Sequence, residues 1–113
     1  MSGVTTHILD TSLGRPAGGV LVTLEIHVGG AFCEVGRGTT DADGRLRTLL
    51  PAGEPVLAGS YRLTFHTGPY FERNGVAGFY PEVSVTFLVR DPAQHYHVPL
   101  LLNPFGFSTY RGS

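Results

Sequence analysis

The chain has 113 residues, of which 42% are hydrophobic and 15% are charged, and its formal net charge is −1. These values are typical of a folded globular protein, and we expect a single domain over residues 1–113. A charge this close to zero, with Lys and Arg scattered singly, argues against nucleic acids and anionic membranes as partners. The chain also has no bilayer-length apolar run, no secretory pattern at its N-terminus and one cysteine, so we expect a cytoplasmic protein.

The first two predicted strands, residues 4–9 and 20–28, alternate apolar and polar side chains. Such alternation is typical of a sheet with one buried face. A glycine-rich turn over residues 14–19, which contains Pro16, separates the two strands. The first strand is expected to point three side chains away from the core, namely Thr5, His7 and Leu9.

Residues 31–38, a shorter segment, and residues 45–50 are predicted as the next two strands. Between them lies Asp43-Gly44, a frequent hairpin sequence. Cys33 is in the middle of the first of these strands and is expected to be a small buried hydrophobe. The second strand should divide into a core face with Leu46, Thr48 and Leu50 and a non-core face with Arg45, Arg47 and Leu49.

The second half of the chain continues with strand-sized segments. Residues 59–66 are predicted as a strand, and residues 69–74 as a short helix that ends at Asn74-Gly75. Another alternating strand lies within residues 79–90, and two final strands are separated by Asn103-Pro104. About eight short strands and one short helix at this spacing indicate an all-β sandwich.

The last nineteen residues carry the densest run of aromatic, apolar and ionisable side chains. In an extended strand, one face is apolar and is expected to face the core: Tyr96, Val98, Leu100 and Leu102. His95 and His97 then point away from the core, as His7 and Arg45 do on their own strands. Taken singly, each of these is most simply explained as a surface residue, since most such residues are incidental.

A zinc site formed by His7, His95 and His97 is one alternative, because three histidines with an open position suit a catalytic zinc ion. His-x-His is a weak signal, however, and neither Glu-x-x-His nor Cys-x-x-Cys accompanies it. Cys33 has no activating histidine nearby in the sequence, and the serines lack a Gly-x-Ser-x-Gly setting. We therefore expect no metal and no local nucleophile motif.

Three segments resemble the signatures of the 5-hydroxyisourate hydrolase family, the transthyretin-related enzymes of urate breakdown. In chain order they are Thr6-His-Ile-Leu-Asp-Thr-Ser-Leu-Gly-Arg-Pro-Ala17, Thr40-Asp-Ala-Asp-Gly-Arg45, and residues 95–113 with the ending Tyr110-Arg-Gly-Ser113. The ending is specific, because transthyretin itself, a hormone carrier of the same fold, lacks it. The resemblance implies an eight-stranded transthyretin-like β-sandwich with one short helix, which assembles as a homotetramer (a dimer of dimers) with active sites at the dimer–dimer interface.

Carried over by position, the resemblance implies a catalytic set of His7, Arg45, His97 and Ser113. It also implies substrate binding by His7 and Arg45 together with Tyr110 and Arg111. His95 matches no catalytic position, so a structural or rim role is expected for it. In a regular strand Tyr110 and Arg111 point to opposite faces, so the tail should either bend at Gly112 or serve two faces. Leu9, Leu49 and Leu101 should give the non-core faces enough apolar area to be covered by another subunit.

The implied reaction is the hydrolysis of 5-hydroxyisourate to 2-oxo-4-hydroxy-4-carboxy-5-ureidoimidazoline in purine catabolism, without a cofactor. We expect His97 to be the general base, oriented by Ser113, and Arg45 to stabilise the developing oxyanion. His7 would position the water or the substrate, and the sequence leaves open whether His7 and His97 exchange roles. The alternative is a transthyretin-type small-molecule carrier without catalysis, which needs an apolar channel in place of these polar groups.

Overall fold

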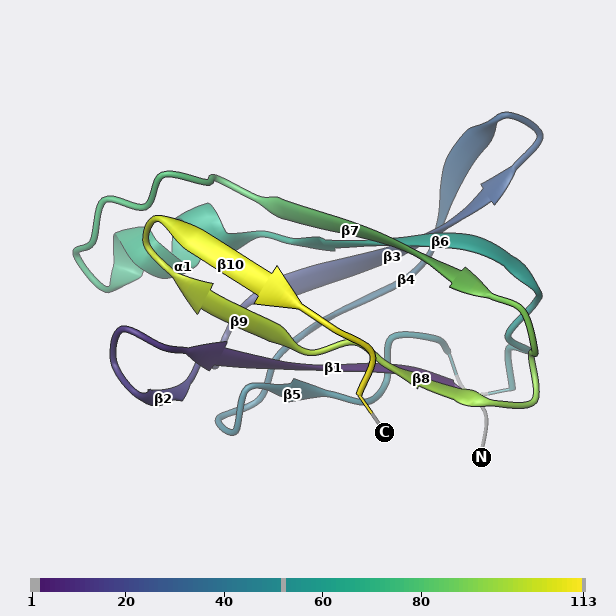
Figure 1. The fold of residues 1–113 in the computed structure, drawn as a ribbon, viewed down its shortest axis with the longest axis horizontal. Coiled ribbons are helices and arrows are strands. Elements are labelled where there is room, and N and C mark those ends of the chain that lie inside the picture. The colour runs from purple at the N-terminus through teal and green to yellow at the C-terminus, as the bar shows by residue number, and fades with distance from the viewer. Residues whose placement is uncertain (1–2, 52, 113) are drawn as a thin grey trace.

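The structure is a computed structural model, and it describes residues 3–51 and 53–112. These residues form two sheets that face each other (Figure 1). The first, which we call the β1 sheet, contains β1 (Gly3–Asp10), β2 (Arg15–Pro16), β5 (Arg45–Leu46), β8 (His95–His97), β9 (Leu100–Asn103) and β10 (Gly106–Thr109). The second, the β3 sheet, contains β3 (Leu21–Val28), β4 (Ala31–Thr39), β6 (Gly59–Phe65) and β7 (Val83–Val89), and α1 (Thr67–Arg73) follows β6. The predicted all-β sandwich with one short helix is confirmed.

Strand β1 is the centre of its sheet. It pairs antiparallel with β2 and β5 along one side and parallel with β8 and β9 along the other. β8 and β9 keep one register along β1, with Thr5 opposite His97 and Ile8 opposite Leu100. Pro99 lies between them and has no amide hydrogen to donate, so the ladder is interrupted there. The C-terminal segment therefore forms three strands where two were predicted.

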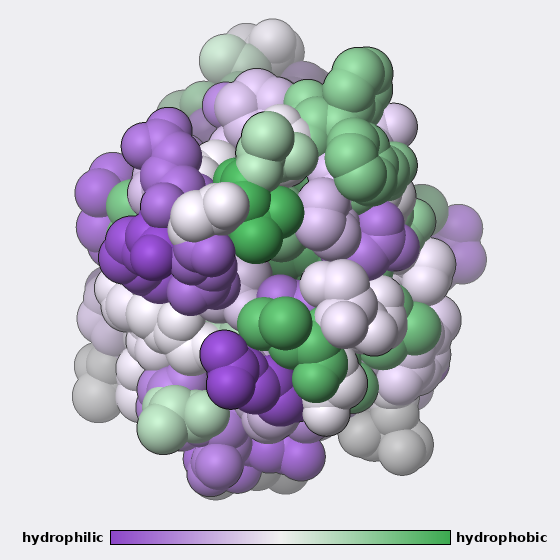
Figure 2. Space-filling view, turned by 90° about the vertical axis from the view of Figure 1, so that its left-hand side faces the viewer, coloured by the Kyte–Doolittle hydropathy of each residue, from purple (hydrophilic) through white to green (hydrophobic). Residues whose placement is uncertain are grey.

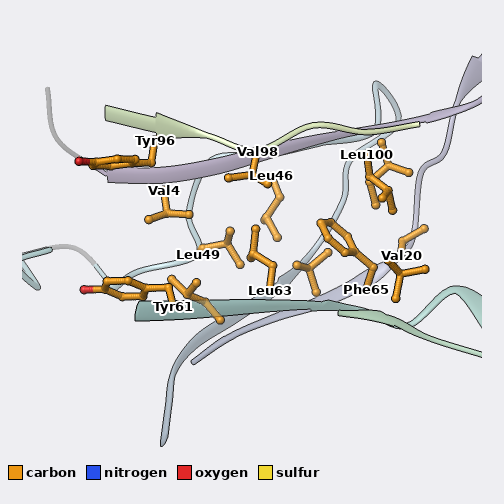
Figure 3. Packing of buried hydrophobic residues seen from close by; sticks show 14 of the residues in the cluster. Val4, Val20, Leu46, Leu49, Tyr61, Leu63, Phe65, Tyr96, Val98 and Leu100 are labelled. Atoms are coloured by element: carbon orange, nitrogen blue, oxygen red, sulfur yellow. The ribbon is translucent and has the colours of Figure 1, made fainter. Parts of the chain in front are cut away.

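The hydrophobic core lies between the two sheets, and Figure 3 shows side chains from both sheets meeting there. The predicted core face of the C-terminal segment is confirmed, because its four side chains are 0–6% exposed: Tyr96, Val98, Leu100 and Leu102. In β1, Val4, Thr6 and Ile8 are also buried, as the alternation predicted. Each fully buried Leu or Ile contributes about 1.5–3 kcal/mol to folding. This burial fixes which side chains of β1, β8 and β9 point outward.

Tyr96 anchors the start of the C-terminal segment. Its hydroxyl donates a hydrogen bond to the carbonyl oxygen of Asp91 (2.9 Å) and accepts one from the amide of Asp91 (3.1 Å). The ring is 5% exposed and lies at one end of the core (Figure 3). Because neighbouring side chains on a strand alternate between its faces, burying Tyr96 turns both His95 and His97 outward.

The turn at Asp43-Gly44 does not form the predicted hairpin. It carries the chain from β4 in the β3 sheet to β5 in the β1 sheet. Gly44 has a φ of 73°, and its carbonyl oxygen accepts a hydrogen bond from the amide of Ile8 (2.8 Å). A Cβ at this position would lie 2.4 Å from the carbonyl oxygen of Ile8. The turn is thus hydrogen-bonded to β1, and only glycine combines this conformation with so close an approach.

The strand after this turn is shorter than predicted, because β5 ends at Leu46. Leu49 is buried in the core with an exposed fraction of 1%, whereas Thr48 is exposed. The chain passes closely over Gly36 of β4, where a Cβ would lie 1.6 Å from the carbonyl oxygen of Leu49. The prediction that Leu49 belongs to the outer face was therefore wrong, since the chain leaves the strand path before that residue.

The strand predicted over residues 31–38 is confirmed as β4, whereas the prediction that Cys33 is buried was wrong. β4 has nine residues, and Cys33 is exposed. β4 lies at the edge of the β3 sheet, and the far end of the β3–β4 hairpin extends beyond the facing sheet (upper right in Figure 1). Alternation alone cannot indicate that no second layer covers this end.

Aromatic side chains connect the segment before β7 with β10 along one side of the sandwich. Phe79 and Tyr80, which precede β7, form an edge-to-face pair, and Tyr80 packs in the same way on Phe107 of β10. The amide of Phe79 also donates to the carbonyl oxygen of Pro104 (2.7 Å).

Viewed from the end that carries α1, hydrophobic residues lie in separate groups among polar ones (Figure 2). In the part of the chain that the structure describes, no helix is long and apolar enough to cross a membrane.

Candidate active site

Three of the predicted catalytic residues meet on the outer face of the β1 sheet. His7 of β1 lies directly opposite Arg45 of β5 in the antiparallel pair. His97 of β8 lies directly opposite Thr5, which is two residues before His7 and therefore on the same face. Directly opposite residues in antiparallel strands have β-carbons about 4.5–5.5 Å apart, so the side chains of such a pair are within reach of one ligand. All four residues are partly exposed.

The backbone holds Arg45 in place while its guanidinium stays available. The carboxylate of Asp41 accepts hydrogen bonds from the amides of Asp43 and Arg45, both at 2.9 Å. These bonds keep the pKa of Asp41 below its ordinary value. The guanidinium of Arg45 forms no ion pair with any residue in the ranges 3–51 and 53–112. A planar set of donors without a carboxylate partner suits a ligand with carbonyl or anionic oxygens.

His97 is held by one of its ring nitrogens. Its Nδ1 is 2.8 Å from the hydroxyl oxygen of Thr5, which leaves Nε2 without a hydrogen-bond partner among the described residues. Burial lowers the pKa of His97 below its ordinary value, and the nearby Arg45 and His7 lower this pKa further, with smaller effects from His95 and Arg47. The neutral imidazole, which is the form that accepts a proton, is thereby favoured.

The end of the chain passes over His97. The amide of Gly112 donates to the carbonyl oxygen of His97 (2.8 Å), and the two residues form a β-bridge. A Cβ on Gly112 would lie 2.6 Å from Cδ2 of His97 and 3.3 Å from Cγ of Pro99. Gly112 does not have a left-handed φ, so glycine is needed here for close approach rather than for a bend. Ser113, the fourth predicted catalytic residue, lies outside the described residues.

Tyr110 and Arg111 lie elsewhere in this chain. Both line a cavity of about 240 Å³ together with residues of β7. Arg111 donates to the side chain of Gln94 (2.9 Å), and its guanidinium lies 4.6 Å from the centre of the Tyr96 ring. Of the two alternatives for the tail, the structure agrees with a departure from regular strand geometry, because the strand ends at Thr109 and both side chains line the same cavity. Their role in substrate binding stays a prediction.

Thr5 is the residue of this site that the sequence did not single out as functional. Its hydroxyl bonds both His97 and His95, the latter through Nε2 at 2.9 Å. The alternation had placed Thr5 on the face of His7, but its partners lie some ninety residues further along the chain and follow only from the register of β1 and β8. Within the described ranges, no three His, Cys, Asp or Glu residues are arranged to hold a metal ion.

The family of the chain follows from its sequence as a whole. The model of the HIUase/Transthyretin family matches residues 4–112. The chain belongs to this family. A 5-hydroxyisourate hydrolase of Halalkalibacterium halodurans is 47% identical over 119 aligned positions, which cover all of both chains. The same enzyme of Salmonella dublin is 44% identical over 97% of this chain and 80% of its own length.

Solved structures similar to this chain include a 5-hydroxyisourate hydrolase and a transthyretin in complex with thyroxine. The structure of Klebsiella pneumoniae 5-hydroxyisourate hydrolase superimposes with a TM-score of 0.86, covers 100% of both chains and is 39% identical. Sea bream transthyretin in complex with thyroxine has a TM-score of 0.87 and 32% identity, over 96% of this chain and 93% of its own. Because the HIUase/Transthyretin fold is shared by both, the function of this chain has to be argued from its site.

Proposed function

We propose that the protein hydrolyses 5-hydroxyisourate to 2-oxo-4-hydroxy-4-carboxy-5-ureidoimidazoline in purine catabolism. The observation that carries the proposal is the convergence of His7, Arg45 and His97 on one outer face of the β1 sheet. A carrier of apolar ligands has no need of two imidazoles and a guanidinium that, among residues 3–51 and 53–112, has no carboxylate partner. The names of the similar enzymes support the same activity.

The proposed reaction begins with attack by water on a ring carbonyl carbon of the substrate. Nε2 of neutral His97 accepts a proton from the water as its oxygen bonds to that carbon. The carbonyl oxygen becomes an oxyanion, and the Arg45 guanidinium stabilises it. The carbon–nitrogen bond of the ring then breaks, and the His97 imidazolium returns the proton to the leaving nitrogen. The chemistry balances with no group other than water and these side chains.

We assign the base to His97 and the positioning of water or substrate to His7. Two observations support this choice: the lowered pKa of His97, which burial chiefly causes, and the bond from its Nδ1 to Thr5, which leaves Nε2 available. His7 lies directly beside Arg45, so it is placed to bind the same part of the substrate as the guanidinium. Ser113 would orient His97, since Gly112 brings the tail against that ring.

We also propose that the domain, residues 1–113, assembles as a homotetramer in which another subunit covers this face. Leu9 and Leu101, paired on the outer face of the β1 sheet, supply apolar area beside the polar cluster. Exposed apolar side chains also occur along the sheet edges at Leu88 of β7 and Phe107 of β10. Cys33, the one cysteine of the chain, is a free thiol, and we keep the cytoplasm as the proposed location.

The test is to generate 5-hydroxyisourate with urate oxidase and to follow its ultraviolet decay with and without the protein. Hydrolysis well above the spontaneous rate, unchanged after chelation, supports the proposal. Decay at the spontaneous rate would contradict it, and tight thyroxine binding by the same sample would then favour the carrier. Loss of activity on chelation, together with bound zinc in a metal analysis, would favour a zinc site at the histidines.

A further inference from the structure

The hydroxyl of Thr5 lies between two imidazoles. Its oxygen is 2.8 Å from Nδ1 of His97 and 2.9 Å from Nε2 of His95. The three side chains come from two strands, β1 and β8, that run parallel and side by side (Figure 1). His97 is half-buried, whereas His95 is exposed. The hydroxyl thus joins the proposed base to a solvent-facing histidine.

Counting protons shows that the two rings are not independent. A hydroxyl has one hydrogen to donate, so it can donate to only one of the two nitrogens and must accept from the other. If Nδ1 of His97 donates to Thr5, then Thr5 donates to a bare Nε2 of His95, and Nε2 of neutral His97 is bare. If Nε2 of His95 donates instead, Thr5 donates to Nδ1 of His97, and the proton of neutral His97 lies on Nε2. The second arrangement removes the lone pair that the general base needs.

We propose that Thr5 and His95 are positioning residues that select the tautomer of His97 with a bare Nε2. The role of His97 as base rests on the proposed function, whereas the coupling between the two rings does not. Residue 95 thereby acquires a role beyond that of a rim residue: it must accept the hydrogen bond from Thr5. Protonation of His95 forces its Nε2 to donate a hydrogen bond to Thr5. Thr5 then donates to Nδ1 of His97, so neutral His97 carries its proton on Nε2 and this nitrogen can no longer accept one.

The surrounding charges bear on this pH dependence. His97 is faced by His7 from β1, by Arg45 from β5 and by Arg47 from the segment after β5. Next to His95, Arg111 of the tail donates to the backbone carbonyl of His95 (3.3 Å) and to Gln94. Arg45 and Arg47 are cationic, so they oppose protonation of His97 and favour its neutral form near neutral pH.

The experiment compares Thr5→Val, Thr5→Ser and His95→Phe with the wild type and with Thr39→Val, an exposed threonine on β4. Thr5→Val keeps the β-branched shape and removes the hydroxyl. We expect kcat to fall about 10–100-fold, the range seen when an outer partner of a functional histidine is removed, while KM changes little. Thr5→Ser should restore most of kcat, and Thr39→Val should match the wild type.

A second readout does not depend on activity. Carbon and nitrogen NMR shifts of labelled histidine report which ring nitrogen carries the proton. We expect the wild-type His97 to carry it on Nδ1, and Thr5→Val and His95→Phe to move it toward Nε2. If Thr5→Val does not fold, His95→Phe, whose side chain is exposed, carries the same test. An unmoved His97 signal in the folded variants, with unchanged kcat, would overturn the coupling. If the wild type has no hydrolase activity but the signal moves, the coupling stands and the proposed function fails.

Discussion

The outer faces of the two sheets carry similar residue types but arrange their charges differently. On the β3 sheet, Arg62 pairs with Glu25 at 2.9 Å and Arg37 pairs with Glu34 at 2.7 Å around a polar hollow of about 410 Å³. On the β1 sheet, Arg45 lies beside His7 and, within the described residues, has no carboxylate partner. Both arginines that line the hollow are therefore paired with carboxylates, whereas Arg45 keeps its donors for a ligand. The pairing of the arginines with carboxylates distinguishes the two faces.

Removing the guanidinium from each face should give the sharpest contrast. We expect Arg45→Ala to lower kcat about 10²–10³-fold, the cost of losing one oxyanion donor. Arg62→Ala on the other face should leave kcat unchanged and change the thermal melt only slightly, since ion pairs at the surface contribute little to stability. Steady-state kinetics and thermal melts of both variants check this. Equal losses of activity in the two would mean that the contrast between the faces has no catalytic meaning.

Gly112→Ala tests the contact between the tail and the site. The added Cβ would lie 2.6 Å from Cδ2 of His97, so either the ring or the tail has to move. A shift of about 1 Å in a catalytic group costs on the order of 10²-fold in rate, so we expect a loss of kcat approaching that size. Gly29→Ala is the matched control, because a Cβ at Gly29 meets nothing within 4 Å, although its positive φ makes some loss of stability expected. Wild-type kcat in Gly112→Ala would show that the tail does not position His97.

The pH dependence of kcat/KM should report the environment of His97. Its pKa is lowered from 6.5 by burial first and by Arg45 and His7 next, so the neutral base persists below pH 6.5. We expect the acid limb of the pH–rate profile to lie below pH 6.5 and to move up in Arg45→Ala, which removes a positive charge. The free energy of unfolding should change with pH in the same direction. Because the folded-state pKa of His97 is lowered, its contribution to stability is present above pH 6.5 and is lost as the pH falls through the folded-state pKa. An acid limb above pH 6.5 would contradict the assignment.

Tyr70→Phe should affect stability and leave the contrast between the faces untouched. The hydroxyl of Tyr70 donates to Oδ2 of Asp10 (2.7 Å), which is 2% exposed. We expect a loss of about 1–3 kcal/mol, because the buried carboxylate loses a partner. In the wild type, burial and the Asp10 bond raise the pKa of Tyr70 to about 12 from 10.0, so this stability is lost as the pH rises from about 10 to 12. Denaturant melts of both proteins at neutral and alkaline pH measure this, and identical curves would contradict it.

Much of the fold could be predicted because alternation depends only on local burial. The pattern located β1, β3, β6 and β7 and the core face at Tyr96. It failed where a distant segment decides the outcome. Gly44 is hydrogen-bonded to β1, Leu49 enters the core over Gly36, and Cys33 is exposed on the edge strand β4. None of these outcomes has a signal within a few residues.

The candidate site shows the same division between local and distant information. The outward direction of His7 and His97 follows from the period of two along a strand. That Thr5 bonds both His95 and His97 depends on a parallel register between residues about ninety positions apart. The resemblance named His7, Arg45 and His97 as a set, whereas their common face required the pairing of three strands.

The most direct test is the single-turnover rate of His97→Ala compared with that of His66→Ala, a histidine in the hollow of the β3 sheet. With 5-hydroxyisourate generated in the same way for both variants, we expect His97→Ala to be about 10²–10⁴-fold slower than the wild type, the usual contribution of a general base. His66→Ala should react at the wild-type rate. A His97→Ala protein that is folded and hydrolyses the substrate at the wild-type rate would contradict the assignment of the base to the outer face of the β1 sheet.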